Sequence, residues 1–344
     1  MKTMRAIVKE SPGEGLQVRE VPVPKPGPGE VLIRILKTSI CGTDLHIYNW
    51  DEWAQSTLKP PLIIGHEFAG RVVGLGGDRQ DLKEGDLVSA EGHLVCGRCR
   101  NCLAGRRHLC AHTIGLGVNR DGVFADFVCL PEENVWRADP AVPTSILSCF
   151  DPLGNAAHAA LSFDLIGEDV LITGAGPVGL MATAIARHVG ARNLVVTDLN
   201  PYRLELARSM GATLALDARR ERVSDAQRQL GMKEGFDVGL EMSGSATALD
   251  EMLGNMIHGG KIALLGILPS GAGVDWQKVI FSSLTLQGIY GRHIFETWYK
   301  VTAMLESGLD VAPVVTHEFA ADDFERGFEL MRSGQCAKVL LDWA

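Results

Sequence analysis

The stretch Gly174-Ala175-Gly176-Pro177-Val178-Gly179 constrains the fold of this 344-residue chain more than any other feature of its sequence. It follows the apolar run Asp169 to Thr173 and opens the helical pattern Val178 to Val189, a context that separates a dinucleotide-binding loop from a chance match. In such a loop the first glycine permits a tight turn, the second lets a pyrophosphate approach the backbone, and the third lets helix and strand pack closely. The helix N-terminus directs N–H groups towards the phosphates. The sequence therefore predicts a Rossmann-type unit that binds a dinucleotide.

Asp198 indicates which dinucleotide this unit binds. It ends a second buried strand, Asn193 to Asp198, nineteen positions after Gly179. An acidic side chain there accepts hydrogen bonds from the adenosine ribose hydroxyls and repels a 2'-phosphate, so NAD is favoured over NADP. We expect Arg203 to contact the ribose or to lie over the adenine. A glycine-rich turn without a ligand is the alternative reading of the loop.

The alternation of strands and helices continues beyond this unit, which predicts a parallel α/β sheet. The N-terminal part is different, because it consists of short β segments separated by glycine and proline. After Asp198, the predicted helices are 202–210, 246–256, 294–307 and 321–333. The predicted strands are 4–9, 29–37, 68–75, 237–242, 261–265, 284–290 and 337–341, with a β-like stretch at 311–319 and turns at 24–29 and 76–78.

Composition limits the kinds of molecule that this chain is expected to bind. A hydrophobic fraction of 46% can fill real cores. The formal charge of −9, from 42 acidic and 33 scattered basic residues, argues against a nucleic-acid partner. No apolar run approaches the roughly 20 residues of a membrane span, and the N-terminus lacks a signal-peptide pattern. We expect a cytoplasmic protein with a small-molecule substrate.

Four of the eight cysteines crowd together as Cys96, Cys99, Cys102 and Cys110. Four thiolates at this spacing can converge on one tetrahedral Zn²⁺ from a single loop. Because a site closed by four thiolates leaves no position for substrate, we predict a structural zinc that stabilises a lobe at about 93–113. An iron–sulfur cluster would use the same ligands.

A second set of metal-binding residue types lies nearer the N-terminus. Cys41, in the stretch 41–46, and His66, in the stretch 65–67, supply the soft and borderline ligands that an open catalytic zinc needs, and we place both stretches in loops of the β region. Glu67 is either a ligand or an anchor for His66. Asp151 offers a further carboxylate, and the sequence leaves open whether Glu67 or Asp151 binds the metal directly. Each residue alone is weak evidence, but their joint presence is much stronger.

The stretch Gly65-His66-Glu67-x-x-Gly70-x5-Gly76 resembles the zinc signature of the medium-chain dehydrogenase/reductase family of alcohol and polyol dehydrogenases. The four-cysteine lobe and the late glycine loop follow in the order typical of that family, so the resemblance covers the whole chain. Longer strings, from Cys41 to Trp53, Phe150-Asp151-Pro152 and 288–292, resemble the bacterial members that oxidise L-threonine. Two departures are Arg79, where the signature has a small or apolar residue, and His293, where glutamate is expected.

The resemblance implies a GroES-like β-rich catalytic domain, 1–150 with 295–344, and a Rossmann NAD-binding domain, 151–294. It implies catalytic-zinc positions at Cys41, His66 and Glu67, and a proton relay through Thr43 and His46. Asp151 matches the carboxylate near the metal. A homotetramer with two Zn²⁺ per subunit is also implied, with a dimer as the alternative assembly. The implied NAD-contacting positions, besides the three loop glycines, are Val178, Asp198, Arg203, Leu265, Gly266, Ile267, Ile289 and Tyr290.

The expected reaction is therefore the NAD-dependent oxidation of the secondary hydroxyl of L-threonine to 2-amino-3-oxobutanoate. The ammonium of such a substrate would suit Asp151 or Glu52, and its carboxylate would suit Arg292 or a nest of backbone N–H groups. Two alternatives remain open: a polyol or secondary-alcohol dehydrogenase of the same family, and a zinc-binding protein without catalysis.

Overall fold

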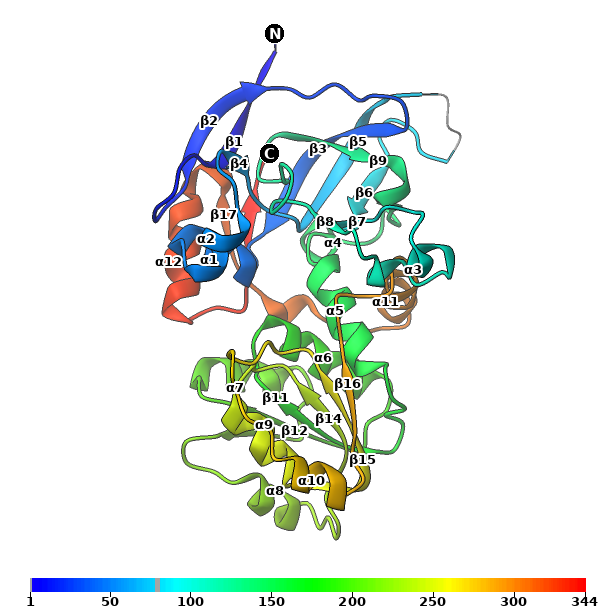
Figure 1. Ribbon diagram of the computed structural model, residues 1–344, viewed down its shortest axis with the longest axis vertical. Coiled ribbons are helices and arrows are strands. Elements are labelled where there is room, and N and C mark those ends of the chain that lie inside the picture. The colour runs from blue at the N-terminus through cyan, green and yellow to red at the C-terminus, as the bar shows by residue number, and fades with distance from the viewer. Residues whose placement is uncertain (1, 78–80) are drawn as a thin grey trace. The chain divides into compact units, whose positions relative to one another are not determined.

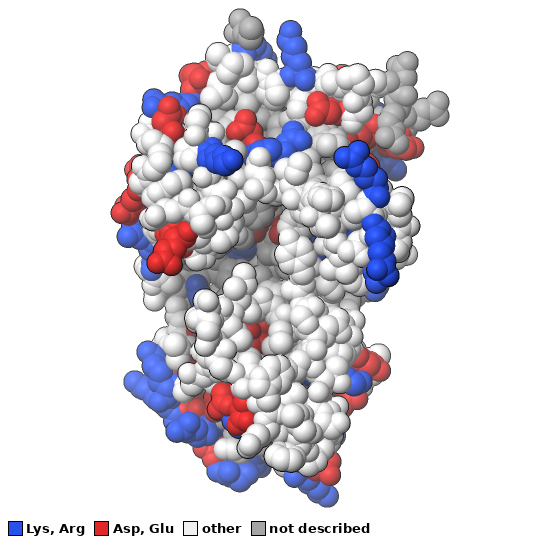
Figure 2. All heavy atoms as spheres, viewed as in Figure 1, with Lys and Arg blue, Asp and Glu red and all other residues white. Residues whose placement is uncertain are grey.

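The computed structural model describes residues 2–77 and 81–344 and divides into two compact units. Unit 1 comprises Met1–Asp151 and Val315–Ala344, and unit 2 comprises Pro152–Val314 (Figure 1). Arg79 and the end of the turn predicted at 76–78 lie outside the described residues. No helix in the described ranges is long and apolar enough to cross a membrane. Figure 2 shows acidic and basic side chains interspersed on both units.

Unit 2 is built on a six-stranded parallel sheet with the strand order β13-β12-β11-β14-β15-β16. Chain order runs outwards in opposite directions from β11 and β14, so the sheet has two halves that meet between these strands. This is the doubly wound Rossmann topology, and the predicted fold class is confirmed. The strands are β11 (Asp169–Thr173), β12 (Asn193–Asp198), β13 (Leu214–Asp217), β14 (Phe236–Glu241), β15 (Met256–Leu264) and β16 (Thr285–Gly288).

Helices connect these strands and pack on the sheet. Helix α6 begins after Gly176 with Pro177 at its first position, where a missing N–H costs nothing. Asn200 caps α7 and Ser245 caps α9 through side-chain oxygens that accept backbone N–H bonds. The helices of this unit are α6 (Pro177–His188), α7 (Pro201–Ser209), α8 (Val223–Gln229), α9 (Ala246–Leu253), α10 (Trp276–Phe281), α11 (Glu296–Glu306) and the 3₁₀ turn η3 (Ala312–Val314); α5 (Phe150–Ala160) starts in unit 1.

Unit 1 contains a larger sheet in the order β10-β6-β5-β3-β18-β17, with β9 also on β3, and two small sheets, β2-β1-β4 and β7-β8. Its buried strands β3 and β5 contribute Val31, Ile33, Ile35 and Phe68 to one core. The strands are β1 (Thr3–Lys9), β2 (Gln17–Pro22), β3 (Glu30–Ser39), β4 (Leu62–Ile63), β5 (Phe68–Leu75), β6 (Leu87–Ala90), β7 (His93–Leu94), β8 (Ile114–Gly115), β9 (Phe127–Pro131), β10 (Val135–Arg137), β17 (Val315–Ala320) and β18 (Lys338–Asp342).

Unit 1 also contains helices, and only the one at 324–333 lies in a range that the sequence predicted as helix, 321–333. Thr43 and His46 lie on helix α1, so placing that segment in a loop was wrong, and α1 stacks Tyr48 on Phe328 of α12 with ring centroids 4.8 Å apart. The helices are α1 (Gly42–Asn49), α2 (Glu52–Thr57), α3 (Arg100–Leu103), α4 (Thr144–Leu147) and α12 (Phe324–Ser333), with 3₁₀ turns η1 (Arg107–Leu109), η2 (Glu132–Asn134) and η4 (Ala321–Asp323).

Candidate active site and metal centres

Cys41, His66 and Glu67 form one potential metal centre in unit 1. One ligand atom from each lies within 4.8 Å of the others. Cys41 follows β3 and caps helix α1, while His66 and Glu67 lie between β4 and β5. Gly65 permits this turn because its φ is +88° and a Cβ there would lie 2.1 Å from the ring of Phe124. Local chain geometry thus brings a thiol, an imidazole and a carboxylate to one point.

Glu67 uses its two carboxylate oxygens differently. Oε2 is 2.5 Å from the buried ammonium of Lys338 and accepts a hydrogen bond from the hydroxyl of Ser39. Oε1 is buried and has no hydrogen-bond partner, and the same is true of Nδ1 of His66. Buried polar atoms without partners are rare in folded proteins. The donor set of sulfur, nitrogen and oxygen together with these orphaned atoms fits a zinc ion.

Two further carboxylates act on His66. Asp44 is fully buried, accepts the backbone N–H of Cys41 at 2.8 Å, and has Oδ1 3.9 Å from Nδ1 of His66. Burial raises the pKa of Asp44 to about 6. Burial by itself would lower the pKa of His66, but the thiol of Cys41 and the carboxylates of Asp44 and Asp151 raise it well above its ordinary value. The thiol and the two carboxylates thus favour a positive charge at this position, whether a proton on His66 or a metal ion.

Asp151 occupies the first turn of α5. A Cβ on Gly92 would lie 3.5 Å from Oδ2 of Asp151 and 3.6 Å from Cβ of His66, so the two side chains flank the same glycine. Asp151 is not part of the group of three ligand atoms found among the described residues. It lies close enough to His66 to act on its charge state and on whatever that centre binds.

Thr43 and His46 lie three residues apart on α1, a spacing that places both side chains on one face of the helix. The imidazole of His46 is 60% exposed and its Nδ1 is hydrogen-bonded to a carboxylate oxygen of Asp51. The other oxygen of Asp51 accepts the N–H of Ala54 at 3.0 Å and so caps α2. Trp53 packs edge-on against the imidazole, with ring centroids 6.1 Å apart. Asp51 therefore orients His46, a function that sequence reasoning had not assigned to it.

The four cysteines of the lobe form the second metal group, with their Sγ atoms within 4.8 Å of one another. None is in a disulfide. Backbone N–H groups of Cys99 and His112 donate to Sγ of Cys96 and Cys110 at 3.4 and 3.3 Å, as they would to thiolates. Bonds from the N–H groups of Cys102 and Ala111 lower the pKa of Cys99 to about 6. A closed set of four sulfur donors fits a tetrahedral zinc and leaves no position for a substrate.

In unit 2, the glycine loop between β11 and α6 has the geometry that a dinucleotide requires. Gly174 has a φ of +91°, and a Cβ at Gly179 would lie 1.9 Å from the carbonyl oxygen of Gly174. A Cβ at Gly176 would meet nothing within 4 Å. Gly174 and Gly179 are therefore required by packing, whereas Gly176 borders open space beside the helix N-terminus, next to the half-buried Val178. Such a cradle fits a pyrophosphate.

Asp198 ends β12 directly beside this loop. Its Oδ2 accepts the N–H of Ala175 at 2.6 Å and its Oδ1 accepts the N–H of Asn200 at 2.8 Å. Each oxygen keeps a second lone pair for a ribose hydroxyl. Arg203 follows on the first turn of α7 and is half-buried.

The other proposed cofactor contacts follow the strands of the second half. Leu265, Gly266 and Ile267 come directly after β15, and Ile289 and Tyr290 come directly after β16. Ile267 is 93% exposed and Tyr290 is 55% exposed, which is unusual for side chains of this size. All of these positions lie at the carboxyl edge of the sheet, where ligands of doubly wound folds bind.

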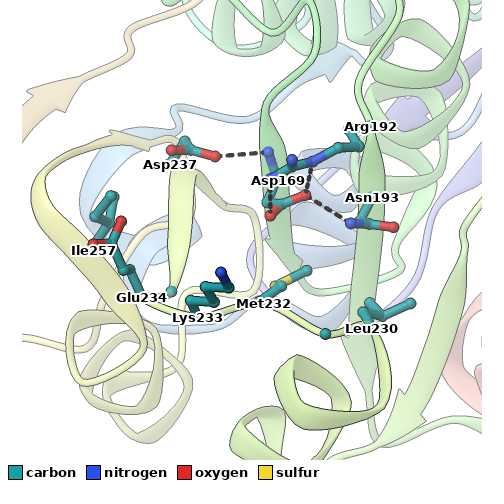
Figure 3. A pocket seen from close by; sticks show the side chains of 11 residues that line it. Asp169, Arg192, Asn193, Leu230, Met232, Lys233, Glu234, Asp237 and Ile257 are labelled. Atoms are coloured by element: carbon teal, nitrogen blue, oxygen red, sulfur yellow. Dashed lines mark hydrogen bonds and ion pairs between the residues drawn. The ribbon is translucent and has the colours of Figure 1, made fainter.

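A pocket of about 360 Å³ lies at the opposite, amino edge of the same sheet. Figure 3 shows Asp169, at the start of β11, receiving hydrogen bonds from Arg192 and Asn193, while the carboxylate of Asp237 accepts the backbone N–H of Asp169 at 2.8 Å. Asp169 is thus fully occupied by partners within the protein, and the pocket lacks the glycine loop. It is therefore not the dinucleotide site.

Arg292 is not an exposed cation. It is 1% exposed, donates to Oδ1 of Asn155 at 3.1 Å, and lies over the ring of Trp298. A Cβ on Gly154 would lie 2.5 Å from Cδ of Arg292. These contacts fix α5 within unit 2 and bury the guanidinium that the sequence suggested for binding a substrate carboxylate.

Comparison with known proteins agrees with this geometry. Residues 27–140 match the family described as alcohol dehydrogenase GroES-like domain, and residues 177–307 match the family described as zinc-binding dehydrogenase. The chain is 58% identical over 341 residues to an L-threonine 3-dehydrogenase of Anaeromyxobacter sp. (strain Fw109-5), covering 99% of each chain. It is 56% identical to that of Solibacter usitatus (strain Ellin6076), covering 99% of this chain and 100% of the other.

Among solved structures, an alcohol dehydrogenase from Escherichia coli CFT073, in complex with NADH, superimposes with a TM-score of 0.91 at 26% identity over 100% of both chains. The two family models and the relatives that the chain covers almost completely indicate the same family. The chain belongs to the zinc-binding dehydrogenases with a GroES-like domain, and within them to the L-threonine 3-dehydrogenase family.

Proposed function

We propose that this chain oxidises the secondary hydroxyl of L-threonine to 2-amino-3-oxobutanoate. In this reaction NAD⁺ takes up a hydride and one proton is released. The observation that carries the proposal is that Cys41, His66 and Glu67 lie together in the unit that also contains Thr43 and His46 on one face of α1. The chain is also 56–58% identical to L-threonine 3-dehydrogenases. A catalytic zinc held by these three ligands and a structural zinc held by the four-cysteine lobe are both part of this proposal.

In this proposal the protein side chains position the substrate hydroxyl and remove its proton. When bound, the zinc supplies a Lewis acid that lowers the pKa of a hydroxyl by several units. Thr43 accepts the released proton at Oγ and passes it towards His46, whose imidazole is exposed to solvent and oriented by Asp51. Asp151 is the carboxylate next to His66 and would attract the substrate ammonium.

The cofactor would bind at the carboxyl edge of the sheet in unit 2. The three loop glycines and Val178 would contact the pyrophosphate, and Asp198 with Arg203 would contact the adenosine ribose. Leu265, Gly266, Ile267, Ile289 and Tyr290 would contact the nicotinamide half. The acid at 198 supports NAD as the cofactor rather than NADP, because its charge would repel a 2'-phosphate.

A homotetramer in the cytoplasm completes the proposal. Strand β16 is one of the two edge strands of its sheet among the described elements, and the neighbouring α10 exposes Trp276, Ile280 and Phe281. Edge strands and exposed apolar faces favour association with another copy. All eight cysteines are free, which supports a reducing compartment. Sedimentation velocity would test the assembly state.

NADH formation at 340 nm with L-threonine, L-serine, sorbitol and 2,3-butanediol tests the activity. The wild type should favour L-threonine, Cys41→Ser should lose turnover, and the matched control Cys129→Ala, which alters a buried thiol outside both metal groups, should keep it. Preference for sorbitol or butanediol would identify a polyol or secondary-alcohol dehydrogenase. Absence of NADH with every substrate in zinc-replete protein would support a zinc-binding protein without catalysis.

A further inference from the structure

Glu241 is a buried carboxylate at the point where the two halves of the parallel sheet meet. It is the last residue of β14, and it is paired with Thr173 of β11 on one side and Leu264 of β15 on the other. Only 1% of its surface is exposed. A carboxylate removed from water in this way is costly unless hydrogen bonds or an opposite charge compensate it.

Hydrogen bonds compensate one oxygen. Oε1 accepts the N–H of Ser243 at 2.8 Å, the N–H of Gly244 at 2.9 Å and the hydroxyl of Ser243 at 2.5 Å. These bonds fold the chain after β14 back on the end of the strand. That segment packs on the dinucleotide loop, because a Cβ at Gly174 would lie 2.9 Å from the backbone of Ser243. Oε1 of Glu241 thus fixes the segment against which the dinucleotide loop packs.

The other oxygen has no such compensation. Oε2 is buried without a hydrogen-bond partner, and no ion pair to Glu241 occurs in the described part of the chain. It is directed at the segment after β15, since a Cβ at Gly266 would lie 2.4 Å from it. The protein therefore keeps an unneutralised carboxylate directly beneath Gly266, one of the proposed cofactor contacts.

The position of Glu241 in the topology indicates which charge it would act on. In a doubly wound sheet each half binds one mononucleotide, and the half with Asp198 holds the adenosine. Glu241 opens the other half, which receives the nicotinamide nucleotide. The nicotinamide ring carries a positive charge in NAD⁺ and none in NADH, while the pyrophosphate charge is the same in both.

We propose that Glu241 is a specificity-determining residue through which this chain discriminates the redox state of its cofactor, because its unpaired carboxylate attracts cationic NAD⁺ more than neutral NADH. The inference rests on the proposed use of NAD. Any repulsion between Glu241 and the pyrophosphate cancels when the two affinities are compared as a ratio. The attraction disappears when the ring becomes neutral, so the charge strengthens binding of the oxidised cofactor and leaves binding of the reduced one almost unchanged.

The test is isothermal titration of NAD⁺, NADH and ADP-ribose into the wild type, Glu241→Gln and Asp237→Asn. Glu241→Gln keeps the shape and an acceptor for Ser243 and Gly244 but removes the charge. We expect its Kd for NAD⁺ to rise on the order of tenfold, as for the loss of one attractive charge in a partly solvated site, with Kd for NADH and ADP-ribose changed less than about twofold. Asp237→Asn removes a charge from the other end of the same strand, about 13 Å away, and should change none of the three.

An unchanged ratio of the NADH and NAD⁺ dissociation constants in Glu241→Gln would overturn the inference, as would an equal weakening of all three ligands, which a purely structural clamp would produce. If the wild type bound neither NAD⁺ nor NADH, the proposed function itself would fail. Should Glu241→Gln lack a cooperative thermal transition, Glu241→Asp replaces it. That variant keeps the charge and should keep the wild-type ratio, so loss of the ratio there would also overturn the inference.

Discussion

Replacing Lys338 by methionine removes the cation that compensates buried Glu67. The Lys338 and Glu67 side chains are 3% and 0% exposed, and Nζ of Lys338 also donates to the carbonyl oxygen of Ile40 at 3.2 Å. Burial alone would lower the pKa of Lys338, but the negative charges of Glu67, Cys41 and Cys149 raise it above its ordinary value. Lys338 is therefore charged near neutral pH, and Glu67 depends on that charge.

The magnitude follows from what remains after the substitution. Methionine fills most of the volume of the lysine stem, so the packing loss is small and the main effect is an uncompensated buried carboxylate, which costs about 3–5 kcal/mol. The double variant Lys338→Met/Glu67→Gln leaves two neutral groups, and Ser39 can still donate to the amide oxygen. Its unfolding free energy should return to within about 1–2 kcal/mol of the wild type, a coupling of several kcal/mol between the two sites.

Urea unfolding followed by tryptophan fluorescence, in zinc-replete buffer and in EDTA, measures these free energies. The matched control is Lys37→Met, on neighbouring β3, because Lys37 also pairs with two carboxylates, Glu318 and Asp342, but those are 41% and 35% exposed. It should cost about 1 kcal/mol or less. A loss below about 1 kcal/mol in Lys338→Met, or no recovery in the double variant, would refute the reasoning.

Three further outcomes are expected. Gly176→Ala should keep the thermal transition of the apoprotein but weaken NAD binding in a titration. Gly179→Ala should lower the transition temperature itself, because a Cβ at residue 179, unlike one at residue 176, would meet backbone at 1.9 Å. Equal effects of the two variants would contradict the separate roles of these glycines. Cys102→Ser should lose one of two zinc equivalents by elemental analysis and unfold at lower temperature, while Cys129→Ala keeps both. Burial lowers the pKa of His158 below its ordinary 6.5, so the unfolded chain binds a proton at this imidazole more tightly than the folded chain does. The stability of the wild type should therefore fall as the pH drops through and below 6.5. Between about pH 7.5 and 5.5, the free energy of unfolding of His158→Gln should fall less than that of the wild type.

The bounds of a strand in unit 2 were predictable where a glycine or an acidic residue marks the end of its short apolar run. Strands β11 and β12 have the predicted bounds, because the first runs into Gly174 and the second ends at Asp198. The helix predicted to reach Met256 ends at Leu253, since Gly254 closes it and Met256 already begins β15. Strand β13 was missed because its four residues carry too short a pattern to distinguish it from a turn.

Helix α1 shows a signal that was present but not used. Its eight residues have no clear apolar periodicity, so the hydrophobic pattern gave no reason to expect a helix. The capping pattern was nevertheless readable, because Asp44 stands three residues after Cys41 and its carboxylate accepts the N–H of Cys41. The error matters for the site, since only a helix places Thr43 and His46 on one face.

The metal groups differ in how far local sequence could describe them. The four cysteines are confined to a span of fifteen residues, so their spacing alone predicts that they meet. Lys338 is 271 residues from Glu67 and has no local signal. The chemistry of burial nevertheless gives a reason to expect the pair. A lysine buried in the apolar strand 338–341 needs a neighbouring anion, and a glutamate buried beside His66 needs a neighbouring cation. Pairing of Leu340 with Ser39 between β18 and β3 satisfies both requirements, because that register places Val339 opposite Ile40 and so brings Lys338 past the end of β3, within reach of Glu67.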